Sequence, residues 1–203
     1  MTQAMPKSVR GTRTREALVG AARRVFERDG YLDARITDIA GEAGVATGSF
    51  YTHFEDKRAA FAAVLAEVHE ETLHPRLEDD VSPEDPVTVI EAANRAYLKA
   101  YRRNAKLMGL MEQVALIDDD FRRLRLERAR AFAERNAKSI RRLQSEGVAD
   151  PTLDPRLAAA ALDGMVSRMA NMVFVHGARI PFEELVLTVT RLWANALRIP
   201  EQR

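Results

Sequence analysis

A short polar segment, Thr47–His53, carries the residues of this 203-residue chain whose types best suit molecular recognition. They are small or hydrogen-bonding and almost uncharged. Hydroxyl and imidazole groups of this kind can bond to the edges of base pairs in the major groove of duplex DNA. A helix this short and polar buries too little apolar surface to be explained by stability alone. The residues that we expect to face outward are Thr47, Gly48, Ser49, Thr52 and His53.

The residues around this segment have the spacing of two short helices that cross at a turn. Such a crossing needs a small residue in the first helix, then a turn residue that tolerates positive φ, followed by an apolar residue. Ala40, Gly44 and Val45 occupy these positions, and Phe50 supplies the apolar contact from the second helix. We therefore predict a helix-turn-helix over Arg35–Phe54. The alternative is a tight corner between two helices that binds nothing.

The rest of the chain has the pattern of an all-α protein. Ala, Leu, Glu and Arg dominate, and apolar residues recur at spacings of three and four, which favours helices throughout. Capping residues, prolines and glycines predict about nine helices and no strand, with a loop at Pro75–Pro86. We expect the helices near Leu18–Gly30, Ile36–Ala43, Thr47–His53, Asp56–His74, Pro86–Tyr101, Leu107–Ile117, Phe121–Glu146, Asp154–Val175 and Pro181–Ile199.

Composition excludes several classes of protein. The chain has 31 basic and 30 acidic residues, 46% hydrophobic residues and no cysteine, so it is neither a disordered tail nor a disulfide or thiolate-metal scaffold. The most lipid-like stretch, Met165–Val175, is broken by Arg168 and Asn171 and falls short of the roughly 20 apolar residues of a spanning helix. Arg23 and Arg24 interrupt any signal sequence. We expect a cytoplasmic protein with no membrane partner and no cofactor.

Charge is distributed unevenly along the chain. The first 15 residues carry only basic charges, whereas residues 59–86 are strongly acidic. A basic arm is attracted to a phosphate backbone by Coulomb forces and counterion release. The alternative is a solvated, flexible terminus. The basic residues are Lys7, Arg10, Arg13 and Arg15.

The N-terminal quarter of the chain resembles the signature of the TetR (tetracycline-repressor) family of bacterial regulators in order and spacing. The remaining helical region is similar to that family in architecture only. The resemblance implies a basic arm over residues 1–10, a helix-turn-helix DNA-binding domain over residues 11–57, and a ligand-binding and dimerisation domain over residues 58–203. The residues that carry it are Phe26, Gly30, Tyr31, Ile39, Ala40, Ala43, Gly44, Val45, Gly48, Tyr51, His53, Phe54 and Lys57.

The resemblance also assigns roles to single residues. The second helix of the motif becomes the recognition helix, with Tyr51 and His53 mainly on phosphates. Lys57 and Thr37 are further phosphate candidates, Lys57 at a helix N-terminus. Tyr51 and Phe54 have an alternative role as packing residues. The residues implied on the DNA side of the recognition helix are Thr47, Ser49, Tyr51, Thr52 and His53.

Two positions depart from the family pattern. Arg35 stands where many relatives have a small hydroxyl residue that caps a helix, and Ala46 stands where they often have serine before the recognition helix. Losing a cap typically costs about 1 kcal/mol, so we expect Thr47 to cap the recognition helix instead. Arg35 is then available for a phosphate or groove contact.

The last two helices have more apolar surface than one subunit needs. The helix after Asp154 is apolar almost all round, and the final helix has two apolar faces. A second copy of the chain would cover the extra face in a four-helix interface, as in the TetR family. The alternative is that these helices only fill the core. The expected interface residues are Ala161, Leu185, Val189, Leu192, Trp193 and Ala196.

Methionine and aromatic residues concentrate in the same half of the chain. Flexible, polarisable side chains suit a pocket for an apolar ligand, although they suit an ordinary core equally well. Asn171 and His176 are the better candidates for binding a ligand's polar end. The expected pocket residues are Tyr97, Tyr101, Met108, Met111, Phe132, Met165, Met169, Asn171, Met172 and His176.

Catalytic and metal sites have little support. His69 and His74 miss the i, i+4 spacing that places two imidazoles on one helix face, and the acidic pairs lie at expected helix starts. The resemblance implies a homodimeric repressor, not an enzyme, released from a palindromic operator in double-stranded DNA by a small, largely apolar effector. The alternatives are a helical protein-binding adaptor, which would not need the recognition helix, and an all-helical enzyme.

Overall fold

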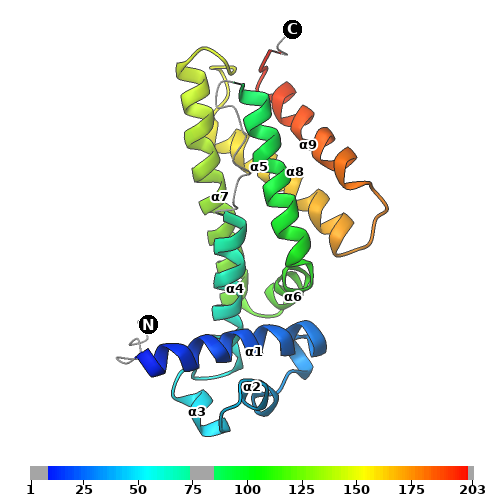
Figure 1. Ribbon diagram of the computed structural model, residues 1–203. Helices are drawn as coiled ribbons and strands as arrows, with labels where there is room; N and C mark the ends of the chain where they lie inside the picture. The colour runs from blue at the N-terminus through cyan, green and yellow to red at the C-terminus, as the bar shows by residue number, and fades with distance from the viewer. Residues whose placement is uncertain (1–8, 74–84, 201–203) are drawn as a thin grey trace.

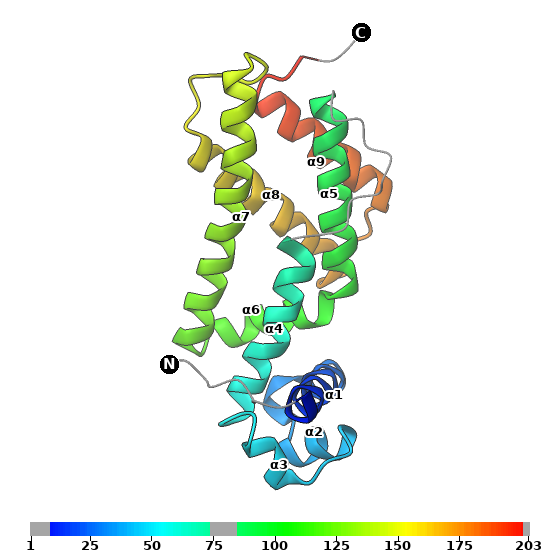
Figure 2. The ribbon, with the colours of Figure 1, turned by 60° about the vertical axis from the view of Figure 1, so that its left-hand side comes forward.

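The computed structural model describes residues 9–73 and 85–200. In these ranges the chain forms nine helices and no strand, as predicted. α1, α2 and α3 form a lower unit, α4 rises from it, and α5–α9 form the upper body, in which α8 crosses between α7 and α9 (Figures 1 and 2). The helices are α1 Val9–Asp33, α2 Ile36–Glu42, α3 Thr47–Tyr51, α4 Lys57–Leu73, α5 Pro86–Arg103, α6 Ala105–Ala115, α7 Asp119–Ser145, α8 Pro155–Phe174 and α9 Phe182–Ala196.

Aspartate caps determine where four of these helices begin. Asp85, Asp118 and Asp154 accept hydrogen bonds from backbone N–H groups in the first turns of α5, α7 and α8. The Oδ1 atom of Asp56 accepts from the backbone N–H of Ala59 at 2.8 Å in α4. Each bond satisfies a donor that has no partner within its helix. The predicted starts of α4, α5 and α8 are confirmed to within one residue, whereas α7 begins at Asp119, two residues before the predicted Phe121.

α1 differs from the expected helix at its end. It continues to Asp33, but Gly30 interrupts the helical geometry with φ 79° and ψ 176°. Glycine adopts this conformation without the steric cost that a Cβ atom would add. The predicted end at Gly30 therefore corresponds to a break in α1, after which one more short turn leads to α2.

The buried apolar residues form two clusters. The lower cluster joins α1–α4 to α6 and the start of α7, and includes Phe26 and Phe61, whose rings meet edge to face at 4.9 Å between centroids. The upper cluster joins α5, α7, α8 and α9. α4 buries Val64, Leu65 and Val68 in the lower cluster, so the packing continues past the expected domain boundary at residue 57. α4 thus connects the lower unit mechanically to the upper body.

Two expectations fall wholly or largely outside the described residues. These are the basic arm over residues 1–10, of which residues 1–8 are not described, and the loop at Pro75–Pro86. Within the described ranges, no helix combines the length and the apolar character needed to cross a membrane.

Candidate nucleic-acid interface and ligand cavity

The turn between α2 and α3 has the geometry that its sequence predicts. Gly44 has φ 69°, and the backbone N–H of Val45 donates to the carbonyl oxygen of Ala40 at 3.0 Å. Ala40 is 1% exposed where the helices cross, and Phe50 of α3 is fully buried. A side chain at position 44 would be strained by positive φ alone, because no atom lies near its Cβ position. The four anchors therefore hold α3 at a fixed angle to α2.

α3 presents a polar outer face. Thr47 and Gly48 are exposed, Ser49 is half-buried, and Thr52 and His53 follow directly after the helix, Thr52 exposed and His53 half-buried. Figure 1 shows α3 at the lower end of the molecule, and these five residues lie in α3 or directly after it. The polar groups of this face are therefore accessible to solvent.

Tyr51 and Phe54 have opposite environments. Tyr51 is 57% exposed, with its ring edge-on to that of Phe50 at 5.6 Å between centroids. Phe54 is 1% exposed and belongs to the lower cluster. Tyr51 is therefore a surface residue with a supported ring, whereas Phe54 has the packing role.

The two departures from the family pattern leave two helices without side-chain caps. Arg35 and Ala46 occupy the N-cap positions of α2 and α3, and neither side chain makes a capping bond. Thr47 is the first residue of α3 and does not replace the cap, which corrects the expectation from sequence. Arg35 and Thr37 are exposed beside the same surface.

Lys57 has a structural role that sequence reasoning missed. Its Nζ donates to the carbonyl oxygens of Leu32 and Ala34, each at 2.9 Å, and lies 5.0 Å from the ring centroid of Tyr31. Partial burial lowers the pKa of the Lys57 ammonium below its usual value. Lys57 therefore holds the turn between α1 and α2 to the start of α4. Two of its three N–H donors are used in this way, and contact with a phosphate stays a prediction.

Polar and aromatic contacts join the lower unit to the upper body. Arg58, at the start of α4, pairs with Asp118 at 3.0 Å and with Asp120. The rings of Phe61 in α4 and Phe121 in α7 lie 5.3 Å apart between centroids. These contacts link the start of α7 to the start of α4, which directly follows the α3 region.

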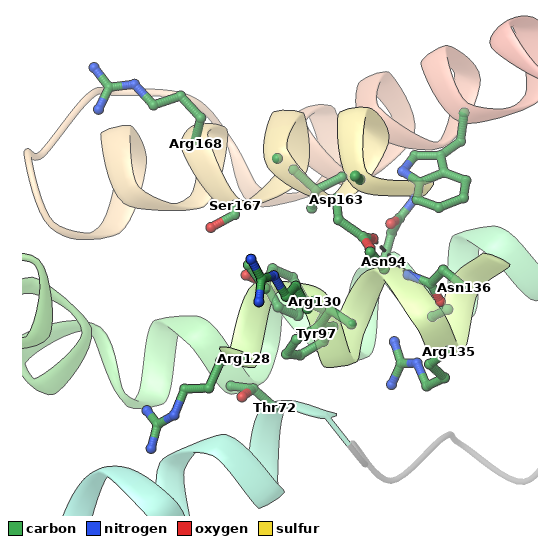
Figure 3. A pocket seen from close by; sticks show the side chains of 18 of the residues that line it. Thr72, Asn94, Tyr97, Arg128, Arg130, Arg135, Asn136, Asp163, Ser167 and Arg168 are labelled. Carbon is green, nitrogen blue, oxygen red and sulfur yellow. Dashed lines mark hydrogen bonds between the residues drawn. The ribbon is translucent and has the colours of Figure 1, made fainter. Parts of the chain in front are cut away.

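The upper body contains a cavity of about 580 Å³ lined by α4, α5, α6, α7, α8 and α9. This volume lies within the range of pockets that hold drug-sized ligands. Figure 3 shows its polar side chains, with Thr72 on α4, Arg128 and Arg135 on α7, and Asp163 on α8. Five of the expected pocket residues line it, namely Tyr97, Met108, Met111, Phe132 and Asn171.

The other five expected pocket residues lie outside this lining. Tyr101 is 1% exposed in the upper cluster, and its hydroxyl accepts from the Asn171 amide at 3.4 Å. Met165 and Met169 pack against the same cluster. Met172 is half-buried and His176 is exposed after the end of α8. The part of α8 that lines the cavity carries mostly polar and small residues instead.

Sequence reasoning missed the charged groups of the cavity. Asp163 accepts from the Asn136 amide at 2.6 Å, but its Oδ2 is buried without a hydrogen-bond partner among the described residues. Burial raises the pKa of the Asp163 carboxyl to about 6. The signal for Asp163 is an acid inside an Ala- and Met-rich helix. The cavity arginines of α7 are indistinguishable in sequence from its surface arginines.

The expected interface residues divide into two groups. Ala161, Leu192 and Ala196 are exposed, with Leu192 at 46%. Leu185, Val189 and Trp193 are buried within the upper cluster, so the expectation that they cover a partner is corrected. These three residues already pack inside their own subunit. Leu157 on α8 and Leu187 on α9 are further exposed leucines, at 73% and 56%.

A bound metal ion needs a set of side chains placed to hold it. The described residues contain no group of three or more His, Asp or Glu side chains placed to hold an ion. The two sites with chemical character are therefore the surface around α3 and the cavity of the upper body.

Comparison with known proteins agrees with this geometry. Residues 18–64 match the sequence model of the bacterial regulatory proteins of the tetR family, which confirms the resemblance found from sequence. The chain is 26% identical to the HTH-type transcriptional regulator TtgR of Pseudomonas putida over 168 residues, or 76% of this chain and 79% of that protein. It is 44% identical to the HTH-type transcriptional repressor BepR of Brucella suis over 52 residues, or 26% and 25% of the two chains.

A solved structure supports the fold over nearly the whole chain. The SmeT–triclosan complex superposes with a TM-score of 0.74 and 20% identity, covering 93% of this chain and 92% of that one. At this identity the likeness shows a common all-α fold and nothing about the ligand. The likeness in fold thus extends well beyond the N-terminal residues that match the family model.

Proposed function

We propose that this chain, as a DNA-binding transcriptional regulator of the TetR family, is a homodimeric repressor that binds a palindromic operator. It acts without a catalytic step, and a small organic effector releases it from the DNA. The observation that carries the proposal is the exposed polar surface around α3, fixed in angle by the buried Phe50. Two such surfaces on one dimer would enter major grooves about one helical turn apart.

DNA recognition would divide between base edges and phosphates. Thr47, Gly48 and Ser49 stand at the start of α3, the end of a recognition helix that usually meets the bases. Tyr51 and His53, with Arg35, Thr37 and Lys57 on the flanks, would contact phosphates, which fix register without reading sequence. We propose base contacts for Thr47, Gly48 and Ser49, and also for Thr52, which is exposed directly after α3.

Dimerisation would use the outer faces of α8 and α9. Leu157, Ala161, Leu192 and Ala196 are apolar and exposed there. Exposed apolar side chains on neighbouring helices are typical of an interface, and a two-fold axis would bring the same faces of two copies together. We therefore propose that residues 58–203 combine ligand binding with dimerisation, while the N-terminal unit binds DNA.

Effector control follows from linkage between the cavity and α3. A ligand that binds more tightly to an arrangement with the wrong separation of the two α3 helices must weaken DNA binding by the same factor. α4 supplies the connection, because Thr72 near its end lines the cavity and Arg58 at its start pairs with α7. The cavity, lined by both polar and apolar side chains, supports this role.

Replacing Tyr51 with alanine is expected to weaken DNA binding about tenfold with the fold intact. Tyr51 is exposed, and a hydrogen bond to a charged phosphate is worth about 1.5–3 kcal/mol. Because phosphate contacts are independent of sequence, a fluorescent duplex of mixed sequence at low salt is sufficient for the titration. Tyr51→Phe, which keeps the ring, should lose most of the same affinity.

Leu116→Ala is the matched control for this titration. Leu116 is 83% exposed at the end of α6, outside the helix-turn-helix, so its variant should bind as the wild type does. Wild-type affinity should also fall steeply as salt increases. An affinity that neither salt nor Tyr51→Ala changes would favour the protein-binding adaptor over the DNA-binding regulator.

A further inference from the structure

Arg128 is a buried positive charge in the wall of the cavity. It is 8% exposed, and its Nη1 contacts the sulfur of Met111 at 3.4 Å, which is a weak acceptor. Its Nε is buried without a hydrogen-bond partner among the described residues, and no carboxylate there pairs with it. Buried charges in proteins are normally paired, because an unpaired one keeps its full desolvation cost. The guanidinium therefore has buried N–H donors that an anionic group could satisfy.

The cost of burial does not neutralise the guanidinium. Burial lowers the pKa of Arg128 to about 10, so it stays charged at neutral pH. The buried carboxylate of Asp163 acts on Arg135, not on Arg128. Figure 3 shows Arg128 on the α4 side of the cavity and Asp163 on the α8 side. An anion at Arg128 must therefore come from outside the described part of the chain.

The other charges of the lining also favour an anion. Glu112 already pairs with Arg125 at 3.2 Å, which leaves Asp163 as the second acid of the lining. The lining holds five arginines against these two acids, and Arg128 and Arg135 are the two that are not exposed to solvent. The five arginines are Arg125, Arg128, Arg130, Arg135 and Arg168.

Apolar side chains surround the charged group. Val68, Met111 and Phe132 line the cavity together with Arg128. A phosphate or other small inorganic anion would leave these surfaces uncovered, whereas an apolar body attached to an anionic group would bury them. A planar guanidinium binds a carboxylate through two parallel hydrogen bonds.

We propose that the cavity binds an amphipathic monocarboxylic acid, whose carboxylate pairs with the guanidinium of Arg128 and whose apolar body lies along Met111 and Phe132. The proposal rests on the proposed function only in taking this acid as the effector. The free Oδ2 of Asp163 then accepts a hydrogen bond from a hydroxyl or N–H group at the far end of a larger ligand.

The single tryptophan of the chain makes binding measurable without DNA. Trp193 lines the cavity, so its fluorescence should respond to an occupant. Matched probes differ only in the head group: dodecanoate, dodecan-1-ol and dodecylamine, each below its micelle concentration, with 1-naphthylacetate and 2-(1-naphthyl)ethanol as a pair of another shape. We expect at least one carboxylate to bind about tenfold or more tightly than its neutral counterpart.

Arg128→Met should abolish this preference while leaving the affinity for the neutral probe nearly unchanged. The ligand-free variant should unfold at a urea concentration no lower than wild type, because methionine replaces an unpaired buried charge. Arg128→Gln is a second variant that removes the positive charge but keeps a polar side chain, and it should lose the preference as well. The matched control is Arg141→Met, since Arg141 is an exposed arginine of the same helix that lies outside the cavity lining.

Three results would overturn the inference: neither carboxylate binds, the alcohol or amine binds as tightly as the acid, or both Arg128 variants keep the preference. Binding of the acid that depends on Arg128 supports it. Adding the bound acid to a DNA titration then separates the two proposals. If DNA affinity does not change, the acid site stands and the effector role in the proposed function is overturned.

Discussion

Replacing Leu192 with glutamate is expected to leave the chain folded but monomeric, and to lower its affinity for a two-site operator at least 100-fold. Leu192 is 46% exposed on α9, so one subunit tolerates a charge there, whereas a packed interface does not. A monomer loses the high effective concentration of the second α3 helix, which is worth a factor of about 100 to 10,000. Sedimentation velocity and DNA titration measure the two effects.

Leu116→Glu provides the control for this change. It introduces the same charge at an 83% exposed leucine on α6, away from the outer faces of α8 and α9. This variant should sediment and bind as the wild type. A Leu192→Glu protein that still sediments as a dimer would place the interface elsewhere on the molecule.

Replacing Asp163 with asparagine is expected to raise the free energy of unfolding at pH 7.5 by about 1–2 kcal/mol. The pKa of the folded-state carboxyl, about 6, lies roughly two units above its ordinary value, so the folded state carries the cost of ionising it at neutral pH. Asparagine keeps an oxygen that can accept from the Asn136 amide. The gain is less than the full cost because the new N–H₂ group also needs a partner.

The raised pKa of Asp163 also makes the stability of the wild type depend on pH. At pH 5 the Asp163 carboxyl is mostly protonated in the folded protein but mostly ionised in the unfolded chain. Its contribution to the free energy of unfolding of the wild type is therefore about 1 kcal/mol more favourable at pH 5 than at pH 7.5. The difference between Asp163→Asn and wild type should therefore shrink as pH falls from 7.5 to 5. Urea denaturation at both values measures it, with Asp119→Asn as an exposed control. A difference that is constant or grows would contradict the burial of a charged Asp163.

Local signals in the sequence were sufficient to predict the helices and the motif. Asp118 and Asp154 cap their helices, and Gly44 has the positive φ that the turn requires. Caps and turns depend on residues that are close together in the sequence, so the spacing of residue types is enough to predict them. The expected cap from Thr47 failed for a related reason, since a one-residue shift in the helix start decides which side chain reaches the free N–H groups.

The cavity could be predicted only in part, because it depends on how distant helices pack. Met111 and Phe132 line it as expected, whereas Met165 and Met169, with the same chemistry, pack in the upper cluster. Composition does not distinguish the two faces of an apolar helix. The same limit applies to α9, where Leu185 and Val189 are buried and Leu192 is not.

Lys57 and Arg128 show what sequence reasoning cannot find. The contacts of Lys57 with Leu32 and Ala34 join residues more than 20 positions apart. Arg128 differs from the other arginines of α7 in its burial, and no carboxylate within the described residues pairs with it. Both facts come from tertiary packing, and both change the expected chemistry of the residue.

Selection of bound duplexes from a pool of random sequence is the measurement that tests the central claim most directly. We predict that wild-type protein enriches an inverted repeat whose half-site centres lie about one helical turn, roughly 34 Å, or slightly more apart, and that two protomers occupy it. Enrichment of an unrepeated site, or retention of DNA with no sequence in common, would contradict a dimer that reads its operator with two α3 helices.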